Sequence, residues 1–309
     1  MKIELRFNVT MTVILASLAA LDSLLAVRTL ASGCMTGRVC AAVALFFVPL
    51  YGLCRWLDLP KGRHACVLVA WTLLTKHLLS LLVQVAGRSP ALLVDRRFAS
   101  MDAVLHFSTG AMVRWAGLHP AIGGTLAAIY GTAAPLILAC ILIPPFFGNE
   151  KDSERYILSI TIAAILTASL FALWPATGPW TVFGFAPTAH QVAVQKYLTL
   201  LKSGAPVRLN FRDAGVVSFP SFHVVLAVLS AIALWRLRRL RCILIALTAG
   251  ICLSTLTTGW HYLIDVIGAL PVIVISHVLA TRLLYPASIP IAGLRISSNR
   301  LARFLPVQE

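Results

Sequence analysis

Long apolar segments alternate with short polar segments along the chain, and this alternation is its dominant pattern. An α-helix needs about 20 mostly apolar residues to cross the hydrocarbon core of a bilayer. The pattern therefore predicts an all-α, polytopic membrane helix bundle with about eight spans. The apolar segments lie at about 8–30, 39–54, 65–86, 121–147, 156–174, 221–236, 242–258 and 260–284.

Composition supports a membrane protein, because 59% of the 309 residues are hydrophobic and only 12% are charged. A soluble domain has about a quarter of its residues charged, so this chain cannot cover itself with a water-compatible surface. No internal repeat or linker divides the sequence. We expect N-terminal transmembrane helices in 1–60, a six-span catalytic core in 61–290 and a basic cytoplasmic tail in 291–309.

The net charge of +15 is carried mostly by short segments between the apolar ones, as membrane insertion and anionic headgroups favour. This distribution does not favour nucleic acid as a partner. The compact cluster Trp-Arg-Leu-Arg-Arg-Leu-Arg at 235–241 is hard to translocate and predicts a cytoplasmic loop. With alternating spans, the loops at 175–220 and 257–261 then lie on the opposite, non-cytoplasmic face.

The first candidate site is the segment Gly-Val-Val-Ser-Phe-Pro-Ser-Phe-His at 215–223, where the sixth apolar segment begins. Pro220 suits a first helical turn, which places Ser221 among free backbone N–H groups that bind anions. His223 follows in the same turn. The alternative is an N-cap serine followed by an interfacial histidine.

The second candidate site is the segment 254–265, where one span ends and the last begins. His261 and Asp265 are four residues apart and are expected to stack on one helix face. A carboxylate there would fix the tautomer of the imidazole and stabilise its cation. The alternative is an interfacial Trp-His-Tyr belt with a buried, hydrogen-bonded aspartate.

The predicted topology puts both histidines at one depth on the same face. One histidine could then attack phosphorus while the other protonates the leaving oxygen. We assign the attack to His261 because it has an acidic partner.

These motifs resemble those of the type 2 phosphatidic acid phosphatase superfamily, KxxxxxxRP, PSGH and SRxxxxxHxxxD. The second motif is Pro-Ser-Phe-His at 220–223, with Phe222 in place of glycine, and the third runs from Ser254 to Asp265, with Thr255 in place of arginine. The first motif is not found. These departures, with Gly-Pro-Trp at 178–180, resemble the branch that contains the inositol phosphorylceramide synthases.

The resemblance implies a phosphohistidine at His261, Asp265 as its orienting partner, His223 as general acid and Ser221 with its backbone as a ligand of phosphate oxygens. It implies no metal or other cofactor. The expected substrate is a lipid with a phosphate headgroup, and the acceptor is water or a small alcohol, so hydrolysis and headgroup transfer both stay open. The expected location is a bacterial inner membrane, with the site facing the periplasm.

A phosphate dianion also needs cations. The nearest before the Pro-Ser-Phe-His segment are Lys202, Arg208 and Arg212, although a solvated basic loop is the alternative for each. Lys76 lies in mid-span, where packing or snorkelling is favoured over lining a polar path. Asp95 and Asp102 neighbour two arginines and are most simply ion-paired.

Two other classes of protein use similar residues. His223, His261 and Asp265 could ligate zinc in a metal-dependent membrane hydrolase. A non-catalytic transporter or scaffold would also carry intramembrane charge, but it would not need both histidines.

Overall fold

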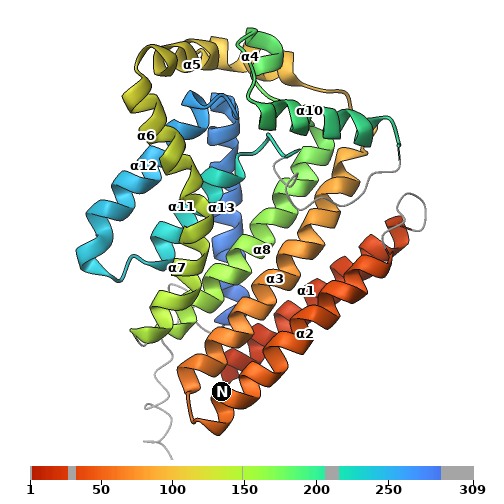
Figure 1. The fold of residues 1–309 in the computed structure, drawn as a ribbon, viewed down its shortest axis with the longest axis vertical. Helices are drawn as coiled ribbons and strands as arrows, with labels where there is room; N and C mark the ends of the chain where they lie inside the picture. Colours follow the sequence, from red (N-terminus) through yellow and green to blue (C-terminus); the bar gives the residue numbers. More distant parts are fainter. Residues whose placement is uncertain (1, 27–32, 148, 206–215, 287–309) are drawn as a thin grey trace, which may run out of the picture.

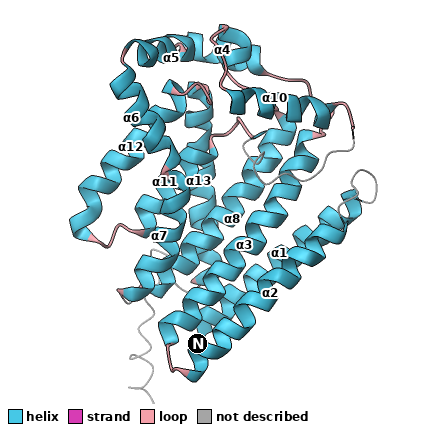
Figure 2. Cartoon of the chain, viewed as in Figure 1, coloured by secondary structure: helices cyan, strands magenta, loops and turns pink. Residues whose placement is uncertain are grey.

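In the computed structural model, the described residues are 2–26, 33–147, 149–205 and 216–286, and they form helices joined by loops (Figures 1 and 2). This confirms the predicted all-α bundle. The helices are α1 (Lys2–Ala26), α2 (Gly33–Trp56), α3 (Pro60–Gly87), α4 (Asp95–Val104), α5 (Thr109–Leu118), α6 (Pro120–Gly131), α7 (Ala133–Phe146), α8 (Glu150–Leu173), α9 (Trp180–Phe183), α10 (Ala189–Lys202), α11 (Phe222–Ala233), η2 (Arg238–Leu240), α12 (Arg241–Thr257) and α13 (Leu263–Leu284).

Six of the described helices are long and apolar enough to cross a membrane: α1, α2, α3, α8, α12 and α13. The pair α6 and α7 makes a seventh when it is counted as one bent span. The expected sixth span, at 221–236, is wrong in length, because α11 has only 12 residues. The helix ends at Ala233, and residues 234–236 form a turn. At its other end, the backbone before α11 bonds to the start of α13 through Ser221 N and Asp265 O at 3.0 Å.

The span at 121–147 bends by 43° between α6 and α7. Pro135 lies in the first turn of α7 and has no N–H to offer the carbonyl of Gly131, the last residue of α6. The hydroxyl of Thr132, between the helices, donates to the carbonyl of Ile129 at 2.6 Å. The bend therefore follows from local sequence.

α8 is the central helix of the bundle and packs against α3, α7, α11 and α13 (Figure 1). Ile157 and Leu158 are neighbours on α8, yet both are completely buried. A helix that is buried around most of its circumference needs apolar residues on every face, which α8 has after its polar first turns. α1 and α2 lie along α3 at one edge of the bundle.

Four short helices, α4, α5, α9 and α10, form a layer at one end of the bundle (Figure 1). α10 begins with a capping box between Thr188 and Gln191. The Gln191 amide also donates from Nε2 to the carbonyl of Thr258 at 3.1 Å. Gly259 follows with φ +72°, a conformation that favours glycine, and turns the chain toward α13. The layer is thus bonded to the turn between α12 and α13.

Basic segments gather at the other end of the bundle. Lys61, at the start of α3, donates from Nζ to the carbonyl of Phe146 at 3.1 Å. Arg236, from the basic cluster, places Nε 3.0 Å from Asp152 Oδ2 at the start of α8. The segments that we expect in the cytoplasm therefore share one end.

Candidate active site

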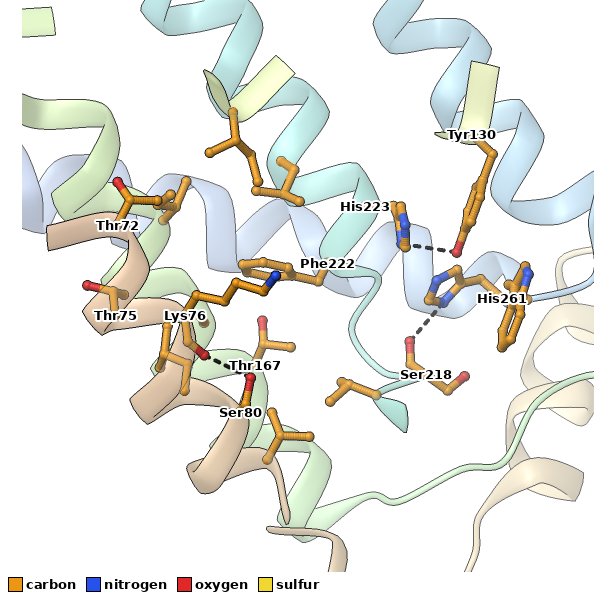
Figure 3. A pocket seen from close by; sticks show the side chains of 18 of the residues that line it. Thr72, Thr75, Lys76, Ser80, Tyr130, Thr167, Ser218, Phe222, His223 and His261 are labelled. Atoms are coloured by element: carbon orange, nitrogen blue, oxygen red, sulfur yellow. Dashed lines mark hydrogen bonds between the residues drawn. The ribbon is translucent and has the colours of Figure 1, made fainter. Parts of the chain in front are cut away.

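His261 lies in the turn between α12 and α13, and its ring is held through one nitrogen. Nδ1 lies 2.9 Å from the carbonyl oxygen of Ser218 and 3.3 Å from Asp265 Oδ2. A carbonyl oxygen can only accept, so the proton of the neutral ring is on Nδ1. Nε2 therefore carries the lone pair, and the ring lines a cavity (Figure 3).

Asp265 contacts His261, but the two residues do not have the expected helical arrangement. α13 begins only at Leu263 with Tyr262 as its N-cap, so His261 is outside the helix and the two side chains do not stack on a helix face. Asp265 is completely buried. Its Oδ2 accepts from Tyr262 N at 2.9 Å and from Ser218 Oγ at 3.0 Å, which joins the two candidate segments.

His223 lies in the first turn of α11, with its ring centroid 6.1 Å from that of His261. Tyr130 of α6 stacks on His223, with centroids 4.1 Å apart and ring planes 24° apart. Its hydroxyl lies 3.1 Å from His223 Nδ1. Both histidines line the same cavity, so one bound group can contact the two rings.

Ser221 is the N-cap of α11, and Pro220 precedes it, so the expectation of Pro220 in the first helical turn is wrong. The N–H of Ser221 bonds to the Asp265 carbonyl. Within the described chain its buried Oγ has no hydrogen-bond partner. The first N–H groups of α11 lack partners within the helix, which leaves a positive end beside His223.

Asp102 of α4 caps the helix that follows His261. Its carboxylate accepts from the N–H groups of Leu263 at 2.8 Å and Ile264 at 2.9 Å. The hydroxyl of Thr109 lies 3.5 Å from both Asp102 Oδ2 and the His261 carbonyl. Asp102 therefore holds the turn that carries His261, and the expectation of an ion pair with a neighbouring arginine is wrong.

Asp95, also on α4, is the second carboxylate that bonds to backbone rather than to arginine. It accepts from the N–H groups of Thr177 at 3.0 Å and Gly178 at 2.8 Å, and from the Tyr262 hydroxyl at 3.1 Å. Gly178 has φ +149°, and a Cβ there would lie 2.2 Å from the ring of Trp180. The Gly-Pro-Trp segment is thus tied to the residue after His261.

A cavity of about 470 Å³ extends from the two histidines along α3, α8 and α11 (Figure 3). This volume is in the range that holds a small-molecule ligand. Its apolar wall includes Leu79, Val83, Ile137, Ile157, Ile160, Ala164, Phe222 and Leu226. The polar groups on its wall include Thr72, Thr75, Lys76, Ser80, Tyr130, Thr167, Thr177, His190 and Ser218.

The expected phosphate-binding cations do not line this cavity in the described structure. Lys202 donates from Nζ to the carbonyls of Ser89 at 2.7 Å and Ala91 at 2.8 Å, so it holds the connection between α3 and α4. Arg208 and Arg212 lie outside the described residues. Lys76 is the one lysine or arginine that lines the cavity in the described part, which is the polar-path position that the sequence left as the less favoured alternative.

Burial controls the protonation of His261. Only 3% of the residue is exposed, and desolvation lowers the pKa of the imidazole from 6.5 to about 4. The hydrogen bond to the Ser218 carbonyl raises the pKa but offsets the desolvation only in part. His261 is therefore neutral at neutral pH.

Sequence spacing missed Tyr130, Ser218 and Asp102, which contact the histidines or the residues beside them. Ser218 lies within the first candidate segment but was given no role there, and no local motif marks Tyr130 on α6 or Asp102 on α4. Among the described residues, no three His, Cys, Asp or Glu side chains form a group that could hold a metal ion.

The fold and the site define an integral membrane protein of all-α class with two histidines at one buried cavity. A comparison with protein-family models matches residues 96–279 to the PAP2 superfamily. The match covers more than half of the chain, and the chain belongs to the PAP2 superfamily. Membership supports a phosphatase-type function. No curated protein and no solved structure matches the chain.

Proposed function

We propose that this protein transfers a phosphoryl group from a lipid through a phosphohistidine at His261. The observation that carries the proposal is the contact of His261 Nδ1 with two acceptors, the Ser218 carbonyl and the Asp265 carboxylate. Both contacts keep the proton on Nδ1 and leave Nε2 as an oriented nucleophile beside the cavity.

In the first step, Nε2 of His261 forms a bond to phosphorus while the bond from phosphorus to the leaving oxygen breaks. His223, which takes up a proton as the phosphate anion binds beside it, donates that proton to the leaving oxygen, and Asp265 stabilises the positive charge on the attacking ring. In the second step, His223 takes a proton from water or a small alcohol. The acceptor oxygen then bonds to phosphorus, and His261 is released.

The phosphate oxygens would bind at the start of α11. Ser221 offers a buried hydroxyl without a partner in the described chain, and the first N–H groups of α11 point from a positive helix end. Arg208 and Arg212 stay predictions as phosphate ligands. Lys202 would first have to leave the carbonyls of Ser89 and Ala91.

The apolar walls of the cavity support a lipid as substrate, with water or a small alcohol as acceptor. Phe222 and Thr255 replace a glycine and an arginine of the usual superfamily motifs, and these departures resemble the branch that contains the inositol phosphorylceramide synthases. This likeness favours transfer of a phospholipid headgroup, beside hydrolysis of a phosphate monoester.

The charge distribution supports a site on the non-cytoplasmic face. Lys61, Arg236 and the start of α8 lie at the end of the bundle away from the layer of short helices, and basic residues favour the cytoplasm. We therefore infer a bacterial inner membrane, with the histidines toward the periplasm.

The test uses purified protein in detergent, with a chelator present. Wild type and His261→Ala are incubated with lipid phosphates and phospholipids, with and without polyols. We expect wild type alone to release phosphate or to move a headgroup, and the product identifies the acceptor. Equal behaviour of the two proteins would refute His261 as the nucleophile and would favour a non-catalytic role.

A further inference from the structure

Lys76 is a cation in the membrane-spanning part of the structure without an anionic partner. It lies near the middle of the span α3 and is exposed rather than buried, and among the described residues its ammonium has no ion pair or hydrogen bond. Figure 3 shows its side chain extending into the cavity on the side of Phe222. An unpaired ammonium in a span costs free energy, so such residues bind a partner or a ligand.

α3 lies before the residues that match the family model, which begin at residue 96. Its cavity-lining positions 72, 75, 76, 79, 80 and 83 recur every three or four residues and so form one helix face. The family match assigns no role to this face.

Two buried hydroxyl groups with unused hydrogen-bonding capacity share the cavity with Lys76. Thr75 of α3 is 4% exposed and Thr167 of α8 is 3% exposed, and neither Oγ1 has a partner in the described structure. Thr72 and Ser80 differ, because each donates to a carbonyl of α3 at 2.8 Å. Buried hydroxyl groups rarely stay unpaired, so Thr75 and Thr167 indicate a missing polar ligand.

We propose that Lys76, Thr75 and Thr167 form a subsite that binds a phosphate group inside the cavity. A single positive charge with hydroxyl donors on two helices suits an anion with several acceptor oxygens. The apolar residues Ile137, Ile157 and Leu226 line the same cavity and suit a hydrocarbon chain. The ligand class is thus a phosphate-bearing lipid that enters the bundle with its chain. This inference rests on the proposed function and adds a substrate-binding group to it.

The experiment measures ligand binding without turnover, in the His261→Ala protein and in the same protein carrying Lys76→Gln, Lys76→Arg or Thr167→Val. Thermal unfolding in detergent is followed against dioctanoyl phosphatidic acid, dioctanoyl glycerol and inorganic phosphate, since a ligand of the folded state raises the Tm. Lys61→Gln is the matched control, because it removes one charge at the other end of α3.

We expect Lys76→Gln to weaken phosphatidic acid binding about tenfold to a hundredfold, as for the loss of a charged hydrogen bond. Lys76→Arg should restore part of the binding, and Thr167→Val should have a smaller effect. Lys76→Gln should not change the binding of the uncharged glycerolipid or the Tm without ligand. Lys61→Gln should not change phosphatidic acid binding. A lower Tm without ligand in Lys76→Gln would instead indicate a structural role and contradict the proposal.

Different results would overturn the Lys76 subsite and the proposed function. Equal phosphatidic acid binding by Lys76→Gln and its parent overturns the subsite while the proposed function stands. If the parent does not prefer phosphatidic acid to the glycerolipid, the lipid phosphate substrate fails, and the subsite fails with it. A parallel loss of inorganic phosphate binding supports recognition of the phosphate alone. A loss confined to the lipid supports recognition that also needs the chain.

Discussion

The carboxylate of Asp102 accepts a hydrogen bond from the N–H of Leu263 at 2.8 Å, across 161 positions of the sequence. The same carboxylate accepts from Ile264 N at 2.9 Å. α4, in the layer of short helices, thus fixes the start of α13, two residues after His261. His261, the proposed nucleophile, is positioned by a contact from outside its own segment.

Asp102→Ala should therefore lower the activity, although Asp102 does not contact the substrate. Two buried N–H groups lose their acceptor, which destabilises the fold by about 1–3 kcal/mol. The shift of His261 should lower kcat more than it changes KM. The measurement is kcat and KM, together with the Tm. Asp102→Asn keeps one acceptor oxygen, so its kcat and Tm should lie between those of wild type and Asp102→Ala. A kcat like that of wild type in Asp102→Ala would show that α4 does not position the catalytic turn.

His223 should matter most when the leaving group is a poor one. For an alkyl phosphate, His223→Ala should lose about 10²–10⁴ in kcat, the usual contribution of a general acid. For a nitrophenyl phosphate the loss should be much smaller, because that leaving group departs without a proton. The measurement compares the two esters in both proteins, with Tyr130→Phe as the variant that leaves the His223 ring in place. An equal loss on both esters would contradict the general-acid role.

The pH dependence should reflect the buried state of His261. Its pKa is lowered to about 4, so the ring keeps its lone pair well below pH 6.5, and the acid-side loss of kcat/KM that protonation of His261 causes should appear only as pH 4 is approached. Between pH 6.5 and 4 the unfolded chain binds a proton that the folded chain does not, so stability contributed by this group falls as the pH is lowered. The measurement is kcat/KM against pH, with the Tm followed in parallel. A half-loss of kcat/KM near pH 6.5 would mean that His261 titrates as it does in water.

Chelators should leave the activity unchanged. Asp265 turns Oδ2 toward His261 Nδ1, the Ser218 hydroxyl and the N–H of Tyr262, so it does not share a ligand position with Nε2 of His261 and the ring of His223. The measurement is phosphate release before and after dialysis against chelator. Loss of activity that zinc restores would support the metal-dependent alternative.

The apolar pattern predicted the bundle because each span must satisfy its backbone internally and face lipid. It overestimated α11, because the helix ends at Ala233 and residues 234–236 form a turn before η2. The layer of α4, α5, α9 and α10 is marked by no long apolar segment, and its place depends on contacts such as that of Gln191 with Thr258.

The two histidines and Asp265 could be predicted as a group because each lies near a helix start at a recognisable spacing. Tyr130 could not, because it reaches His223 through the bend between α6 and α7. Lys76 could not either, because only the packing of α3 beside α8 places it at the cavity. Spacing along the chain predicts which residues are neighbours on one helix, but it does not predict contacts between helices.

The most direct test of the phosphohistidine mechanism is to trap the phosphoenzyme from a lipid phosphate that carries a radiolabelled phosphoryl group. The protein is quenched in alkali, digested and sequenced by mass spectrometry. The mechanism predicts an acid-labile, alkali-stable phosphoryl group on His261 in wild type and none in His261→Ala. A phosphoryl group on His223, or turnover by His261→Ala at the rate of wild type, would contradict it.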